Sequence, residues 1–124
     1  MMTEKIHKIP VIIDCDTGID DAVSLMWAVK SDKLDIKLIV TDVGNVSPKQ
    51  AAKNTLDILE LIGAPDIPVI AGDGKCLRQE RKRYSAHGKT GLGEYVFEDH
   101  SRRELKGDAV KRIYEILSAA KRTS

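Results

Sequence analysis

Four aspartates crowd into eight positions directly after a short apolar run, and this feature constrains the chain more than any other. The run is Ile9–Ile13, and the carboxylates are Asp14, Asp16, Asp20 and Asp21. A short β-branched run is typical of a strand buried on both faces. Clustered carboxylates repel one another unless a cation lies among them, and Ca²⁺ and Mg²⁺ prefer oxygen ligands. The sequence therefore predicts a divalent-cation site at a strand end.

Apolar residues recur at helical spacing in three later segments, and two further short runs read as strands. Helices are expected over about 20–30, 48–62 and 110–120, and strands over 37–41 and 68–72. Ser47 fits an N-cap with Pro48 at the first helical position, and Gly63 ends that helix. Residues 73–106 show no clean period. Strand and helix therefore alternate along the chain.

Successive β-α units imply parallel strands joined by right-handed crossovers. We expect a single α/β domain over residues 1–124, an open and mostly parallel sheet of Rossmann-like type with flanking helices. Ligands of such sheets bind at the carboxyl ends of the strands. Both the acidic cluster and Gly44–Asn45 lie at predicted strand ends. The two motifs are thus expected to converge on one edge of the sheet.

Composition excludes several classes of function. The 124 residues are 42% hydrophobic and 31% charged with a net charge of +1, which favours a globular protein without a field for nucleic acid. No apolar stretch approaches the roughly 20 residues that span a membrane, and the N-terminus lacks a signal peptide. Cys15 and Cys76 form neither a disulfide framework nor a metal-binding spacing. A cytoplasmic location is expected.

The motifs resemble one known family. Residues 12–22, which read Ile-Ile-Asp-Cys-Asp-Thr-Gly-Ile-Asp-Asp-Ala, are similar to the N-terminal signature of the inosine-uridine-preferring nucleoside hydrolases. Val43–Ser47 resembles the family's Gly-Asn motif, and His87–Gly93 its His-Gly-x-x-Gly-Leu-Gly loop. Ala64–Pro65 and Pro68–Gly72 match as well. The resemblance covers about residues 9–117 and implies the N-terminal part of the nucleoside hydrolase fold.

The resemblance implies a role for each matching residue. Asp16 corresponds to the carboxylate that binds Ca²⁺ and accepts a proton from the attacking water. Asp21 corresponds to a bidentate calcium ligand, and Asp20 to the group that hydrogen-bonds a ribose hydroxyl. A simpler alternative for Asp20 and Asp21 is that they only favour the positive end of a helix.

Three further residues receive supporting roles from the same resemblance. Asp14 corresponds to a supporting carboxylate. Asn45 corresponds to a substrate-binding residue, a neutral polar group that also orients the acidic site. His87 falls in a loop near the base. The alternatives are a turn residue for Asn45 and a structural histidine for His87.

The implied activity is calcium-dependent hydrolysis of ribonucleosides to base and ribose. Members of the family are more than twice as long, and the remaining site residues come from the part that this chain lacks. One alternative is therefore an inactive fragment that binds metal weakly or self-associates into a homo-oligomer. Another is a haloacid-dehalogenase-like phosphatase, which also carries Asp-x-Asp after an apolar strand, although Gly18 departs from that pattern.

Overall fold

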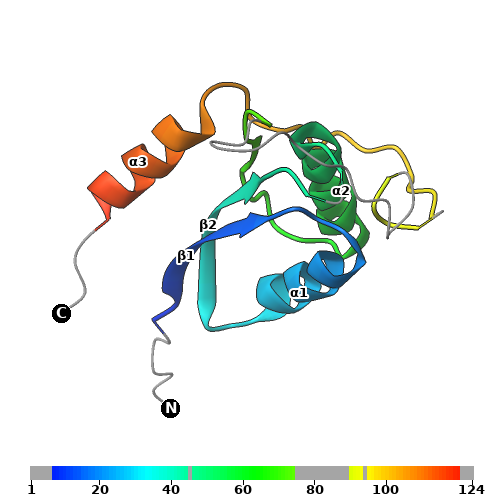
Figure 1. The fold of residues 1–124 in the computed structure, drawn as a ribbon. Coiled ribbons are helices and arrows are strands. Elements are labelled where there is room, and N and C mark those ends of the chain that lie inside the picture. Colours follow the sequence, from blue (N-terminus) through cyan, green and yellow to red (C-terminus); the bar gives the residue numbers. More distant parts are fainter. Residues whose placement is uncertain (1–6, 45, 75–89, 94, 121–124) are drawn as a thin grey trace, which may run out of the picture.

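The computed structural model describes residues 7–44, 46–74, 90–93 and 95–120. Three strands and three helices alternate along these segments (Figure 1). They are β1 (Ile9–Cys15), α1 (Ile19–Lys30), β2 (Leu34–Thr41), α2 (Pro48–Leu61), β3 (Val69–Ala71) and α3 (Ala109–Ala119). No helix in these segments combines the length and the apolar character needed to cross a membrane.

The strands form one parallel sheet in the order β1-β2-β3. Helices α1 and α2 cover one face, where Leu25, Leu56 and Leu59 pack with Ile39 and Val69. Helix α3 packs on the other face, over a cluster of Leu38, Val40, Ile70 and Ala109. The predicted α/β class with an open parallel sheet is confirmed.

Strand β1 is less buried than its sequence indicates. The apolar run predicts burial on both faces, yet Ile9 is 61% exposed and Val11, Ile12 and Ile13 are only partly buried. The reason is position: β1 is the terminal strand in the sheet order, with β2 as its partner on one side. An apolar sequence indicates that a strand can be buried on both faces. The actual burial of the strand depends on which elements pack beside it in the sheet.

The helix signals are confirmed for α2. Ser47 Oγ accepts a hydrogen bond from the backbone N–H of Gln50 at 3.1 Å, and Pro48 opens the helix. Gly63, just beyond the C-cap, adopts φ +63°, which favours glycine. The apolar residues of α3 do not all face the sheet. Ile113 and Ile116 pack on it, whereas Leu117 is exposed.

Strand β2 carries one residue more than the ladder needs. Val11 pairs with Ile36 and Ile12 pairs with Leu38, so Lys37 is the extra residue of a β-bulge. Ile36 packs with the α1/α2 core, whereas Leu38 belongs to the α3 core. The bulge thus distributes the apolar residues of β2 between the two faces.

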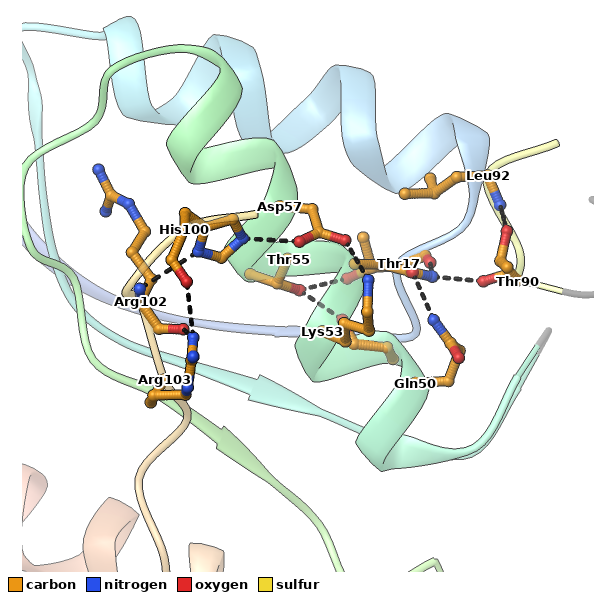
Figure 2. A network of polar contacts seen from close by, with 12 residues as sticks. Thr17, Gln50, Lys53, Thr55, Asp57, Thr90, Leu92, His100, Arg102 and Arg103 are labelled. Carbon is orange, nitrogen blue, oxygen red and sulfur yellow. Dashed lines mark hydrogen bonds and ion pairs between the residues drawn. The ribbon is translucent and has the colours of Figure 1, made fainter. Parts of the chain in front are cut away.

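Residues 97–105, here called the strap, run along α2 before α3 begins. His100 Nε2 contacts Asp57 Oδ1 at 2.7 Å, and both side chains are nearly buried (Figure 2). His100 Nδ1 accepts the backbone N–H of Arg102 at 3.2 Å, so Nε2 carries the proton donated to Asp57. Arg102 also pairs with Glu60 at 2.7 Å, and Leu105 bridges to Ile70 of β3. These contacts fasten the strap to α2 and the sheet.

His100→Ala should destabilise the chain. The substitution removes the proton donor from Oδ1 of a buried carboxylate, while the Lys53 ammonium still contacts Asp57 Oδ2 at 2.7 Å. We expect a loss of about 1–3 kcal/mol in the free energy of unfolding, measured by urea denaturation with circular dichroism. Glu115→Ala, which breaks an exposed 3.8 Å pair with Arg112, is the control and should change stability by less than about 0.5 kcal/mol. An equal effect of both variants would contradict the role of the strap.

Candidate active site

The carboxyl ends of the three strands lie level with one another. Cys15 pairs with Thr41, and Thr41 pairs with Ala71. The backbone N–H of Asp42 donates to the Cys15 carbonyl at 3.0 Å, and that of Gly72 donates to the Thr41 carbonyl at 2.8 Å. Residues that follow each strand are therefore brought to one edge of the sheet, as the sequence predicts.

Asp16 and Asp21 form an acidic pair at this edge, just beyond the end of β1. The backbone N–H of Asp16 donates to Asp21 Oδ2 at 3.1 Å, and the two side chains are also hydrogen-bonded. Burial, followed by the neighbouring Asp16, raises the pKa of Asp21 to about 6. Two carboxylates can approach this closely only when a proton or a cation lies between them. The local electrostatics therefore favour a positive charge at this point.

Asp14 and Asp42 form a second acidic pair beside the first. Their side chains are hydrogen-bonded, which together with partial burial and the charges of Asp42 and Asp16 raises the pKa of Asp14 to about 6. A hollow of about 580 Å³ opens from this pair towards Asp73 and the start of α3. Asp42 was not among the site residues predicted from the sequence. Its position directly after β2 is the signal that could have identified it.

Gly44 leaves space for the Asp16 carboxylate. A Cβ at position 44 would lie 2.0 Å from Asp16 Oδ2 and 2.6 Å from Asp16 Cβ. Because the Asp16 Cβ is fixed close to the backbone, a larger residue at 44 would force the loop itself to move. The loop after β2 therefore forms a cradle for Asp16.

The donor set fits a hard divalent cation in part. Asp16 and Asp21 supply carboxylate oxygens, which such ions prefer, and their close approach is relieved by positive charge. Within the described segments, no three or more His, Cys, Asp or Glu residues are arranged to hold a metal ion. The two aspartates would thus hold one side of the ion, with its other ligands coming from elsewhere.

The structure describes four of the six residues predicted for the site and brings three of them together. Asp14, Asp16 and Asp21 lie at the sheet edge, and Asp20 is exposed in the first turn of α1. Asn45 and His87 lie outside the described residues. The acidic positions are therefore grouped as expected, and their individual roles remain predictions.

Polar residues of α2 that support the acidic loop were not predicted as part of the site. Asn54 Nδ2 donates to the Thr17 carbonyl at 3.1 Å, and Thr55 Oγ1 lies 2.8 Å from Thr17 Oγ1. All three residues are buried. An asparagine and a threonine within an apolar helical face are the signal that could have found them, because buried polar groups require partners.

A parallel α/β sheet with carboxylates gathered at its carboxyl edge defines a class of ligand-binding or catalytic proteins. Residues 11–124 match the inosine-uridine preferring nucleoside hydrolase family, and the chain belongs to this family. Nucleoside hydrolases are metal-dependent as a family. Membership confirms the resemblance seen in the motifs and leaves the phosphatase alternative without support.

Individual relatives agree with this assignment. The chain is 40% identical over 112 residues to the pyrimidine-specific ribonucleoside hydrolase RihA of Photobacterium profundum, covering 90% of this chain and 36% of the relative. It is 36% identical to the non-specific ribonucleoside hydrolase RihC of Escherichia fergusonii, covering 91% of this chain and 37% of the relative. The structure resembles a purine-preferring ribonucleoside hydrolase from Gardnerella vaginalis with a TM-score of 0.82 and 28% identity, covering 90% of this chain and 37% of the other. The chain thus spans little more than a third of these proteins.

Asp14→Asn should stabilise the cation-free chain at neutral pH. The folded-state pKa of about 6 exceeds the ordinary 3.8, so ionised Asp14 destabilises the fold above pH 6 and this cost vanishes as the pH falls towards 4. We expect the variant to gain roughly 0.5–1 kcal/mol at pH 7, because water screens a partly exposed pair, and almost nothing at pH 4. Urea denaturation at both pH values measures this, with exposed Asp66→Asn as the control for general charge loss. A gain that is the same at both pH values would contradict the Asp14–Asp42 coupling.

Proposed function

We propose that this chain provides the cation- and ribose-binding half of a site that hydrolyses the N-glycosidic bond of ribonucleosides. The observation that carries the proposal is the Asp16–Asp21 pair at the sheet edge of a nucleoside hydrolase family member. Within this proposal the cation is Ca²⁺. Bound there, it would hold ribose hydroxyls and lower the pKa of a water molecule.

Asp16 is proposed as both a cation ligand and the base. Its backbone N–H is already engaged by Asp21, and the Gly44 cradle limits where its carboxylate can lie. A carboxylate held in this way can accept the proton of an attacking water. Asp21 is proposed as the second cation ligand.

The acidic surroundings also suit the transition state. Breaking an N-glycosidic bond develops positive charge on an oxocarbenium-like sugar. The carboxylates of Asp14, Asp16 and Asp21 lie close enough to share hydrogen bonds or direct charge interactions. Their negative field would stabilise the developing charge, and direct attack by water would invert the anomeric carbon.

Asp20 and Asn45 are proposed to bind the ribose, Asn45 by orienting the acidic site. Asp20 lies in the first turn of α1, one residue before Asp21, on the sequence that carries the family motif. Asp14 and His87 are proposed as supporting residues. The relatives' names range from pyrimidine-specific through non-specific to purine-preferring. The proposed substrate is accordingly the ribonucleoside class as a whole.

Activity of these 124 residues alone is proposed to be low. The chain spans little more than a third of its relatives, and Asp16 with Asp21 supplies only part of the six to eight oxygens that calcium takes. Cation binding should consequently be weak. A cytoplasmic location is proposed on the composition of the chain, which is 42% hydrophobic and 31% charged.

The test is turnover of inosine and uridine by the purified chain with Ca²⁺, read as released base and ribose. We expect little or no turnover, with any residual activity lost in Asp16→Ala. Cation binding is measured in parallel through the luminescence of Tb³⁺, an ion of calcium-like size and oxygen preference.

Asp16→Ala and Gly44→Ala should both weaken Tb³⁺ binding by about tenfold or more, because each removes or displaces a ligand. Gly93→Ala is the control for backbone strain, since its φ of +67° disfavours alanine while a Cβ there meets nothing within 4 Å, and it should leave Tb³⁺ binding within about twofold. Turnover or Tb³⁺ binding that is unchanged in Asp16→Ala would refute the site assignment. Rapid turnover by the unmodified chain would refute the proposal that the site is incomplete.

We also propose that the chain associates with a second copy of itself. Val23 and Trp27 lie one turn apart on α1 and are 64% and 81% exposed. Val110, Tyr114 and Leu117 form a similar strip on α3, and β1 is an edge strand. Exposed apolar strips and open sheet edges are typical of association surfaces.

Light scattering should give a mass well above the 13.7 kDa of one chain. Trp27→Lys should lower the apparent mass, because it places a charge in the apolar strip of α1. Val96→Lys, an exposed site outside both strips, should not. A monomer at all concentrations would overturn self-association, and a monomer that binds a separately expressed C-terminal part of a relative would favour complementation.

A further inference from the structure

One buried side chain in α2 connects two loops that are distant in sequence. Asn54 is 2% exposed, and both N–H groups of its side-chain amide donate hydrogen bonds. Nδ2 donates to the carbonyl of Thr17 at 3.1 Å and to the carbonyl of Thr90 at 2.5 Å, while Oδ1 accepts from Gln50 Nε2 at 2.9 Å. Figure 2 shows Thr17 and Thr90 beside Gln50 of α2.

The first of the two loops is the acidic one. Thr17 directly follows Asp16 and is fully buried. Its hydroxyl lies 2.8 Å from Thr55 Oγ1, which donates to the Ala51 carbonyl, and 3.2 Å from Cys15 Sγ. Helix α2 therefore holds Thr17 twice, at its backbone carbonyl through Asn54 and at its side chain through Thr55.

The second loop, residues 90–93, is seated directly on the first. A Cβ on Gly91, whose φ is +89°, would lie 3.2 Å from Val46 Cγ1, 3.3 Å from Asn54 Nδ2 and 3.4 Å from the Thr17 carbonyl oxygen. Leu92 packs with Ala22 of α1 and Ile58 of α2. The close approach requires glycine, and it places two electron-rich carbonyls on either side of one amide.

Only a side chain with two N–H donors of this length can satisfy both carbonyls. Serine and threonine carry one donor, and aspartate at neutral pH carries none. Two carbonyls left without donors in a buried position would repel each other and lose their hydrogen bonds. The amide of Asn54 thus decides whether the two loops lie together or apart.

We infer that Asn54 is a positioning residue that locks residues 90–93 against the acidic loop and so keeps the backbone of Asp16 and Asp21 in place. Its significance for catalysis rests on the proposed function, whereas the linkage between the loops does not.

The test is hydrogen–deuterium exchange of the whole chain, followed in peptides that cover residues 16–22 and 90–93. Asn54→Asp is nearly isosteric and removes both donors. We expect exchange about tenfold faster or more in both segments. Thr55→Val is the matched control on the same helix, and it should accelerate exchange in residues 16–22 only. Equal effects of the two variants on residues 90–93, or no effect of Asn54→Asp there, would overturn the inference.

Gly91→Ala tests the same lock from the other side should Asn54→Asp fail to fold. Its added Cβ pushes against Asn54 and Thr17, so exchange should accelerate in residues 16–22 as well as 90–93. Gly93→Ala carries a comparable backbone strain at φ +67° but has open space around its Cβ, so it should affect residues 90–93 alone. Unchanged exchange of residues 16–22 in Gly91→Ala would refute the linkage.

Tb³⁺ affinity separates positioning from general stability. Asn54→Asp should bind Tb³⁺ about tenfold more weakly under conditions in which it remains folded. Ile70→Val lowers stability from the opposite face of the sheet and should leave the affinity within about twofold. Equal losses in both variants would overturn the positioning role. Absence of Tb³⁺ binding in the unmodified chain, with the exchange pattern as expected, would count against the proposed cation site and leave the lock supported.

Discussion

Repulsion among carboxylates at the carboxyl edge of the sheet is the constraint to which the surrounding structure responds. Parallel pairing places the ends of β1 and β2 level, so Asp14, Asp16 and Asp42 cannot avoid one another. Below about pH 6, a proton shared within the Asp14–Asp42 or Asp16–Asp21 pair would relieve part of this repulsion. A cation would relieve more of it, and the same crowding that destabilises the chain at neutral pH therefore provides the driving force for binding.

Side chains of helix α2 hold the segments around the charged edge in place. Asn54 and Thr55 fix the acidic loop, and Asp57, less than one turn further along, receives His100 from the strap. The helix thereby connects the acidic loop, residues 90–93 and the strap, each of which is remote from it in sequence. The buried polar residues of α2 lie within an apolar layer and are all hydrogen-bonded. In the described part of the chain, no buried side-chain polar atom lacks a partner.

Local signals in the sequence predict the fold well, because they act over a few residues. The Ser47–Pro48 helix start and the helical stripe of α1 depend only on neighbouring positions, and both are confirmed. Burial of β1 depends on what pairs with its other edge, which no local pattern contains. The acidic cluster was recognisable by its spacing, whereas Asp42 and Asn54 join the site only through parallel pairing and helix packing. Hydrophobic periodicity and short sequence motifs do not contain information on contacts between residues so distant in sequence.

The bulge in β2 has a consequence for how this chain can change length. Counting residues in twos from Leu34 would place Leu38 and Val40 on the face of Ile36, but they lie in the opposite core because Lys37 is one residue in excess of the ladder. Loss of Lys37 would leave a regular ladder with each core intact. Loss or gain of a single residue between Leu38 and Val40 would exchange the two faces of the strand's end. We therefore expect β2 to tolerate a change in length at the exposed Lys37 and not elsewhere in the strand.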